Sequence, residues 1–165
     1  DLILDSKKYP ATTPVFGQSN LINILAAATM AYQLKVDPKK IIESIANLKP
    51  TPHRLEVKQF ENGITYIDNA FSSNVDGFKL ALEFLATFKK RPKILVTPGI
   101  VLLADRSKDI HHELGKLSAK VCDRIILVGQ SERTKALEEG IKDSEKVLYI
   151  NQISEVWPTI TSLNL

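Results

Sequence analysis

The sequence predicts an α/β protein built on a doubly wound, mostly parallel β-sheet. Short runs rich in β-branched and aliphatic residues alternate with longer stretches of helical periodicity. The runs are apolar throughout, which is typical of strands buried on both faces of a parallel sheet. A length of 165 residues suffices for one such domain and an appendage. The runs expected as parallel strands are residues 94–96, 125–128 and 147–150.

Two helices are expected ahead of this domain. Residues 20–34 carry small and apolar side chains at helical spacing, which predicts a well-buried helix. Asp37 and Pro38 suit the cap and the first position of a second helix, which Pro50 and Pro52 would end. Residues 49–52 are therefore the predicted linker, with one domain over residues 1–50 and another over residues 51–165.

After the linker, the pattern predicts a β-hairpin followed by alternating helices and strands. Residues 55–60 and 64–67 read as antiparallel strands around a turn at residues 61–63. Helices are expected over residues 75–88, 107–121 and 132–141. Ligands bind beyond the carboxyl ends of the strands in such sheets, so the loops of interest are residues 68–74, 97–106 and 129–132.

Composition narrows the class of protein. The net charge of +3 comes from scattered lysines without interleaved aromatic residues, which does not favour nucleic-acid binding. Cys122 is the single cysteine, so no internal disulfide can form; it fits a reducing compartment and is expected in the core. No apolar run approaches the roughly 20 residues that span a bilayer, and no signal-peptide pattern opens the chain. We therefore expect a cytoplasmic protein without a membrane partner.

The most informative loop for chemistry is residues 68–74, which leaves a strand and leads into a helix. Its serine and asparagine side chains and its backbone N–H groups favour an anion such as a phosphate or a carboxylate, although Asn74 or Ser73 could equally serve as a helix cap. The chain contains no P-loop and no nucleophile elbow. Its histidines have no metal-ligand spacing with the cysteine, and His111 and His112 are expected to be solvated. We assign no metal and no catalytic residue, and these arguments alone lead to an α/β ligand-binding domain.

Three segments resemble the Mur ligase family. Residues 14–28 (PVFGQSNLINILAAA) resemble the end of the family's central ATP-binding domain. Residues 52–56 (PHRLE) with residues 63–74 (GITYIDNAFSSN) resemble the start of its C-terminal domain, and residues 97–101 (TPGIV) through Gly115 extend the similarity. The resemblance implies a Rossmann-like C-terminal domain preceded by a helical tail of the central domain.

The family resemblance also implies an activity. These ligases use ATP and Mg²⁺ to convert a carboxylate of UDP-MurNAc-peptide to an acyl phosphate, which an incoming amine attacks. Residues 70–74 and 97–101 look most like the branch that adds D-Ala-D-Ala to the tripeptide. By resemblance, Asn23 would contact adenine, Arg54 the ATP phosphates and Asn69 the nucleotide. The residues that would hold the incoming dipeptide are Ser72, Ser73 and Asn74.

The sequence departs from the family pattern at three places. Ser19 replaces a histidine, Asn69 replaces an aspartate, and residues 102–105 (LLAD) stand where Glu-Leu-Gly is common. Asn69 therefore offers a neutral acceptor where a charged one could bind ribose or orient Mg²⁺. The resemblance implies a fragment truncated at both ends and inactive alone, because it has no P-loop and the missing part would mainly bind ATP and Mg²⁺. The alternatives are another amino-acid-adding Mur or folylpolyglutamate-type ligase, and a non-catalytic ligase-like domain that binds a nucleotide or a partner.

Overall fold

The computed structural model describes residues 1–61, 63–71, 74–89 and 92–163. It divides into two compact units, Asp1–Ser72 and Ser73–Leu165, and each is described by itself. The expected domain boundary between residues 50 and 51, placed in the proline-containing linker, stays a prediction.

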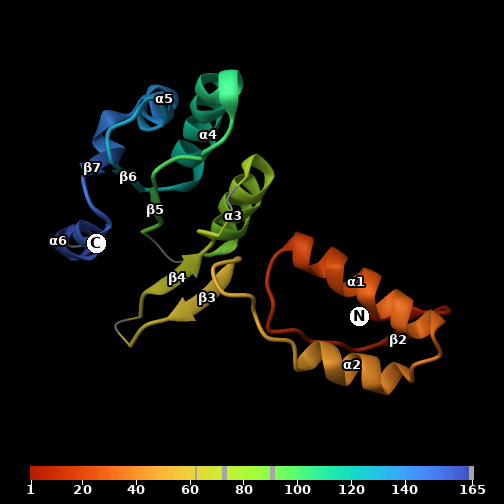
Figure 1. Ribbon diagram of the computed structural model, residues 1–165. Coiled ribbons are helices and arrows are strands. Elements are labelled where there is room, and N and C mark those ends of the chain that lie inside the picture. Colours follow the sequence, from red (N-terminus) through yellow and green to blue (C-terminus); the bar gives the residue numbers. More distant parts are fainter. Residues whose placement is uncertain (62, 72–73, 90–91, 164–165) are drawn as a thin grey trace. The chain divides into compact units, whose positions relative to one another are not determined.

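The first unit opens with a small hairpin and two helices that share a core (Figure 1). Strands β1 (Leu2–Leu4) and β2 (Lys7–Tyr9) pair antiparallel. Helices α1 (Gln18–Gln33) and α2 (Pro38–Ala46) follow, and Asp37 caps α2 by accepting a hydrogen bond from the Lys39 N–H at 2.8 Å. The predicted cap and the predicted Pro38 position are thus confirmed. The shared core consists of Leu2, Leu4, Ala28, Ile41 and Ile45.

Helix α1 forms as predicted, but the expectation that it is well buried is wrong. Ala28 is its one buried residue, whereas Ile22 is 61% exposed and Met30 is 64% exposed. One face of the helix packs against the core through Ala28, with Ile24, Ala31 and Tyr32 partly buried beside it. A composition rich in alanine and leucine predicts the helix without predicting how much of its circumference is covered.

The remaining element pair of the first unit is the predicted β-hairpin. Strand β3 (Glu56–Gln59) pairs antiparallel with β4 (Thr65–Asp68) in a separate two-stranded sheet. The register places Gln59 opposite Thr65 and Glu56 opposite Asp68. Two acidic residues therefore face each other at the open end of the hairpin.

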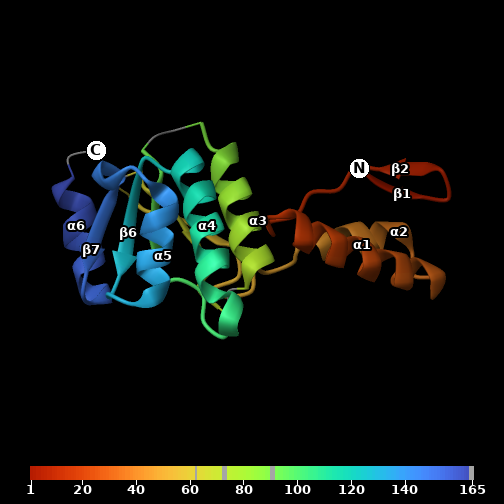
Figure 2. The same cartoon turned by 90° about the horizontal axis from the view of Figure 1, so that it is seen from above.

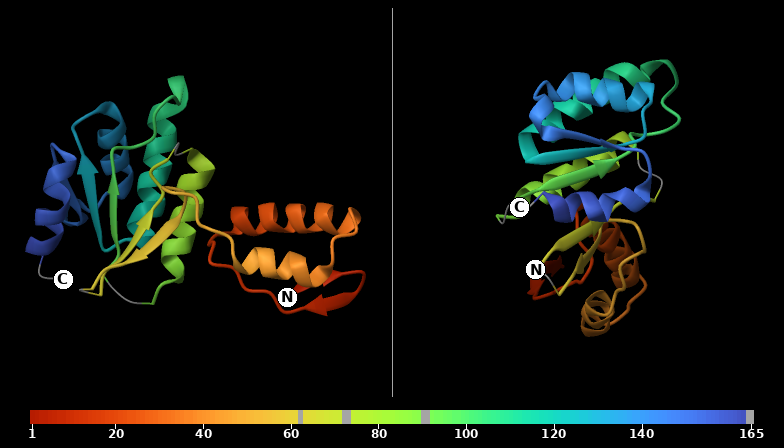
Figure 3. Two further views of the ribbon diagram at one scale, coloured as in Figure 1. Left: turned by 60° about the horizontal axis from the view of Figure 1, so that its bottom comes forward. Right: turned by 90° about the vertical axis from the view of Figure 1, so that its left-hand side faces the viewer.

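The second unit contains the predicted parallel sheet, with strand order β5-β6-β7. These strands are Ile94–Thr97, Arg124–Val128 and Val147–Ile150. Figure 2 shows α3 (Val75–Thr87), α4 (Ser107–Val121) and α5 (Glu132–Ile141) side by side. In Figure 3, α4 and α5 lie on one side of the strands and α6 (Val156–Ser162) on the other, so helices flank both faces of the sheet. The described residues of this unit also form short 3-10 turns: η1 (Ala104–Arg106), η2 (Ser144–Lys146) and η3 (Ile153–Glu155).

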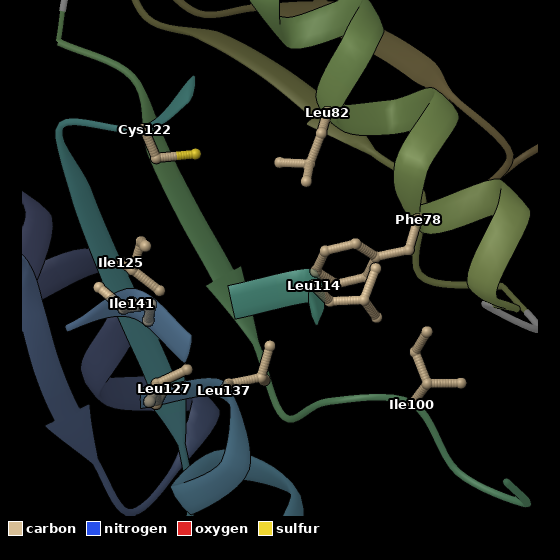
Figure 4. Close-up of a cluster of buried hydrophobic side chains, with 9 residues drawn as sticks. All are labelled: Phe78, Leu82, Ile100, Leu114, Cys122, Ile125, Leu127, Leu137 and Ile141. Carbon is tan, nitrogen blue, oxygen red and sulfur yellow. The ribbon is translucent and has the colours of Figure 1, made fainter. Parts of the chain in front are cut away.

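The core of this unit lies between the sheet and its helices (Figure 4). Ile125 and Leu127 of β6 point to the same face and pack with Leu114, Leu137 and other apolar side chains. Ile126, which alternates to the opposite face of the strand, is also fully buried. Burial on both faces confirms the pattern that predicted a parallel sheet. Within the described residues, no helix combines the length and apolar character needed to cross a bilayer.

Cys122 is the C-cap residue directly after α4 and is 1% exposed, which confirms the expectation that it is a core residue. Burial in these apolar surroundings raises the pKa of its thiol to about 12. The thiol is therefore protonated at neutral pH and behaves as a small apolar side chain.

Candidate functional site

The entrance and exit of the β3–β4 hairpin bring several polar side chains together. The entry loop turns sharply, because His53 and Leu55 both adopt left-handed backbone angles, with φ of 60° and 50°. Such angles are unfavourable for residues with a Cβ and persist only where other contacts fix them. The contacts that fix this loop come from the end of β4 and from the residues just after it.

Asp68 is the central acceptor of this arrangement. It is 5% exposed, and its Oδ2 lies 2.8 Å from His53 Nδ1. Its Oδ1 accepts a hydrogen bond from the Ala70 N–H at 3.2 Å. Burial works against ionisation of Asp68, but the hydrogen bonds from His53 and Ala70 together hold its pKa below the usual range. Asp68 is therefore a buried carboxylate that joins the entry loop to β4.

Replacing Asp68 with asparagine should remove a pH-dependent part of the stability of the first unit. The native pKa is lowered, so the contribution is complete above the ordinary carboxyl pKa of about 4 and is lost as pH falls below it. We expect Asp68→Asn to cost on the order of 1–3 kcal/mol at pH 7 and progressively less towards pH 2. Urea unfolding at a series of pH values measures this, with Glu61→Gln as the control because Glu61 is an exposed carboxylate of the same hairpin. A difference between wild type and Asp68→Asn that stays constant with pH would contradict the assignment.

Glu56 holds the other side of the loop. Its Oε2 accepts a hydrogen bond from the His53 N–H at 3.2 Å and lies 3.1 Å from Lys58 Nζ. Lys58, and then the His53 N–H, lower the pKa of Glu56. The hairpin thus supplies a carboxylate on either side of the His53 residue, one to its backbone and one to its ring.

Arg54 is presented outward by this loop. Its guanidinium lies over the ring of Phe71, 4.7 Å from the centroid. The Phe71 N–H donates to the His53 carbonyl at 3.0 Å, and the Leu55 N–H donates to Asn69 Oδ1 at 3.1 Å. Across the part of the chain that the structure describes, Arg54 makes no ion pair. An oriented, exposed guanidinium of this kind suits recognition of a phosphate or a carboxylate.

The structure brings two of the predicted nucleotide-binding residues together. Arg54 and Asn69 are linked through the entry loop, whereas Asn23 lies in α1 as an exposed residue. Asn74 belongs to the second unit, where its Oδ1 accepts from the Gly77 N–H at 2.7 Å and caps α3. The capping alternative for Asn74 is thus confirmed. Ser72 and Ser73 lie outside the described residues. The ligand roles of all six remain predictions.

The loops after β5 and β6, two of the loops of interest named from the sequence, each contain a glycine in a left-handed conformation at the carboxyl edge of the sheet. Gly99 and Gly129 have φ of 82° and 75°, which glycine adopts without strain. In the loop after β5, Leu102 has φ of 63° and is 98% exposed. A left-handed backbone angle is strained for leucine, and no packing contact of the exposed side chain offsets the strain. The segment 102–105, which departs from the family pattern, therefore contains an unusual backbone conformation.

The expectation that His111 is solvated is wrong. His111 is fully buried, its Nε2 accepts from the Ile100 N–H at 2.9 Å, and its Nδ1 lies 2.6 Å from the Ser107 carbonyl. A ring with its proton on Nδ1 satisfies both contacts and fixes the loop after β5 to α4. His112, one residue on, is half-buried. The neighbouring charged residues suggested solvent, but the position of His111 on the helix turns its ring towards the loop after β5, where the Ile100 N–H binds it.

Sequence reasoning missed the pairing of His53 with Asp68 and the position of Glu56. The position of the turn could have revealed this pairing. In a hairpin that turns at residues 61–63, each step back along the first strand is matched by one step forward along the second. Once Gln59 faces Thr65, Glu56 must face Asp68. Two carboxylates opposite each other in an antiparallel pair are unfavourable without a compensating cation.

Comparison with known proteins assigns the family. Residues 53–164 match the protein-family model described as "Mur ligase, glutamate ligase domain". This match covers more than half of the chain, and the chain therefore belongs to the Mur ligase family. The predicted family is confirmed, and so is the predicted fold class.

The similar proteins include two branches of the family. UDP-N-acetylmuramoyl-tripeptide--D-alanyl-D-alanine ligase of Escherichia coli is 27% identical over 129 residues, covering 78% of this chain and 28% of that protein. UDP-N-acetylmuramoylalanine--D-glutamate ligase of Cytophaga hutchinsonii is 28% identical over 145 residues, covering 87% of this chain and 28% of that protein. A crystal structure of MurF from Acinetobacter baumannii superposes with a TM-score of 0.78 and 26% identity, over 93% of this chain and 33% of that one. The chain thus spans about a third or less of each of these relatives.

Proposed function

We propose that the protein carrying this chain is an ATP-dependent ligase of peptidoglycan precursor synthesis that joins D-Ala-D-Ala to UDP-MurNAc-tripeptide. Family membership and the names of the relatives support a precursor ligase. The strongest structural support is the position of Arg54, whose exposed guanidinium lies over the Phe71 ring at the start of the matched domain. Phosphate recognition is the chemistry for which such a group is best suited.

In this proposal the chain contributes to binding of both substrates. Arg54 contacts the ATP phosphates, Asn69 the nucleotide and Asn23 the adenine. The incoming dipeptide is held by Ser72, Ser73 and Asn74. Asn69 carries no charge, so the contribution of this position to nucleotide binding is weaker than that of an aspartate. Mg²⁺ accompanies ATP and offsets the charge of its phosphates.

The proposed reaction proceeds in two steps. The terminal carboxylate of the tripeptide attacks the γ-phosphorus of ATP, which forms an acyl phosphate and releases ADP. The amine of D-Ala-D-Ala then attacks the acyl carbon, forms the amide bond and releases inorganic phosphate and a proton. The bound amine is held close to the acyl group and water is excluded, so amide formation is favoured over hydrolysis of the acyl phosphate.

A second candidate is the D-glutamate-adding activity. It is favoured by the likeness to the Cytophaga hutchinsonii ligase, which covers the larger share of this chain. The Pro-His-Arg sequence at residues 52–54 is compatible with either branch.

A substrate-pair assay of the natural protein separates these candidates. UDP-MurNAc-tripeptide with D-Ala-D-Ala, and UDP-MurNAc-L-Ala with D-Glu, are each incubated with ATP and Mg²⁺, and the products are identified by mass spectrometry. We expect the pentapeptide from the first pair. Product from the D-Glu pair alone would establish the second candidate, and absence of product with bound nucleotide would indicate a non-catalytic binding domain.

The 165-residue chain by itself is expected to hydrolyse no ATP, because its sequence contains no P-loop. Release of inorganic phosphate from ATP is measured with the purified chain in the presence of Mg²⁺ and both peptide substrates. Turnover above the buffer control would contradict this part of the proposal.

A further inference from the structure

His53, Glu56 and Asp68 form a cluster at the open end of the β3–β4 hairpin. Each offers one ligand atom, and these atoms all lie within 4.8 Å of one another. The three residues come from the entry loop, the first position of β3 and the last position of β4. Pairing of Glu56 with Asp68 across the strands fixes their separation. The cluster is therefore built into the register of the hairpin.

The excess of negative charge in the cluster favours binding of a cation. Two carboxylates face each other, and Lys58 lies beside Glu56 with its side chain 46% exposed. Asp68, whose side chain is 6% exposed, faces the His53 ring nitrogen. The two carboxylates and Lys58 together carry a net charge of −1, and the Asp68 side chain among them is buried. Burial of a charge without full compensation is unfavourable.

The contact between His53 and Asp68 is the most specific feature. Nδ1 and Oδ2 are 2.8 Å apart, so the two atoms already lie close enough to be neighbouring ligands of one ion. A metal ion bound by both would replace the hydrogen bond between them with two coordinate bonds.

We propose that His53, Glu56 and Asp68 bind a divalent first-row transition-metal ion, with Zn²⁺, Co²⁺ and Mn²⁺ as the fitting class. One imidazole nitrogen and two carboxylate oxygens suit these ions, whereas Mg²⁺ prefers oxygen ligands alone. Metal–ligand distances of about 2.0–2.2 Å place neighbouring ligand atoms roughly 3 Å apart. His53 and Asp68 are near that separation, so binding would require the Glu56 carboxylate to turn from Lys58 towards them. His53 is 56% exposed, so water or a ligand oxygen can complete the coordination.

Metal binding would stabilise the loop that presents Arg54. The ion would link the entry loop to both strands by coordinate bonds, in place of the single hydrogen bond between His53 and Asp68. Arg54 follows His53 directly, so its backbone is fixed by the same ion. The inference does not rest on the proposed ligase activity, because it concerns the hairpin alone.

The test is zinc binding to the natural protein without nucleotide or peptide substrate. Chelator-treated protein is titrated with Zn²⁺ by calorimetry, and Co²⁺ is added in parallel to record visible absorption. We expect wild type to bind one equivalent more than His53→Ala, and Glu56→Gln to bind that ion about 10–100-fold more weakly. Zn²⁺ should raise the Tm of wild type more than that of either variant.

The matched control is His112→Ala. His112 has Glu113 at 3.8 Å, and within the described residues it belongs to no group of three metal-ligating side chains. Its removal should leave the zinc stoichiometry and affinity unchanged. Circular dichroism verifies that each variant is folded, and Glu56→Gln keeps the test decisive if His53→Ala unfolds. Equal zinc binding by wild type, His53→Ala and Glu56→Gln would overturn the proposal, as would the absence of saturable binding by wild type below millimolar Zn²⁺.

Discussion

Replacing Gly115 or Gly140 with alanine is expected to destabilise the second unit by about 2–4 kcal/mol. The two glycines lie where α4 and α5 pack against each other. A Cβ on Gly115 would lie 2.1 Å from the Leu137 carbonyl oxygen, and a Cβ on Gly140 would lie 2.0 Å from the His112 carbonyl oxygen. Both obstacles are backbone atoms, so no side-chain rotation relieves the contact. The helices must move apart by roughly 1 Å to restore van der Waals distance.

The sign of this effect separates packing from helix propensity. Alanine favours a helix over glycine by about 1 kcal/mol, so propensity alone predicts that both variants are more stable than wild type. Separation of α4 from α5 would also disturb Leu114 and Leu137, which are 0% and 1% exposed. Tight packing of these side chains makes even a small displacement costly. We therefore expect the packing penalty to exceed the propensity gain.

Urea unfolding followed by circular dichroism measures the change. Gly129→Ala is the control, because a Cβ there meets no atom within 4 Å and only the left-handed φ of 75° opposes the substitution. Its cost should be about 1 kcal/mol. Stability equal to or above that of wild type in both Gly115→Ala and Gly140→Ala would show that α4 and α5 do not pack as described.

Arg54→Ala is expected to lower kcat/KM for ATP by about 10²–10³-fold in the substrate-pair assay. The guanidinium is exposed and oriented by Phe71, and removing it deletes a charged donor proposed to contact the phosphates. Arg54→Lys should recover part of the activity, because lysine keeps the charge and loses the planar contact with the ring. Steady-state kinetics with ATP as the varied substrate distinguishes these outcomes.

The control for Arg54 is Lys40→Ala, which removes one exposed positive charge from α2 of the same unit. It should leave kcat/KM unchanged, since a general electrostatic effect would act on both variants. Unchanged kinetics in a folded Arg54→Ala protein would contradict the proposed role of Arg54.

The sequence was most informative where local chemistry and periodicity agree. Helix α4 begins and ends at Ser107 and Val121 as predicted, and the caps at Asp37 and Asn74 were readable because their side-chain oxygens satisfy free N–H groups of the first turn. The β1–β2 hairpin was not predicted. Its turn uses Asp5 and Ser6 with φ of 44° and 64°, where glycine would have marked the left-handed positions.

The candidate site was only partly readable for a different reason. Arg54 and Asn69 were identified through the family resemblance. Their link through the Leu55 N–H depends on left-handed backbone angles at His53 and Leu55, which are not glycines and so do not predict such angles. His53 and Asp68 are 15 residues apart, and the hairpin register brings them into contact. Contacts set by pairing between strands become visible only after the turn position is converted into a register.

The most direct test of the proposed ligase activity is the fate of the oxygen atoms of the tripeptide carboxylate. UDP-MurNAc-tripeptide labelled with ¹⁸O in that carboxylate is incubated with D-Ala-D-Ala, ATP, Mg²⁺ and the natural protein. An acyl phosphate intermediate transfers one carboxylate oxygen to phosphate, so we predict one ¹⁸O in inorganic phosphate for each pentapeptide formed, detected by mass spectrometry. Pentapeptide accompanied by unlabelled phosphate, or ATP consumption without any pentapeptide, would contradict this account of the protein.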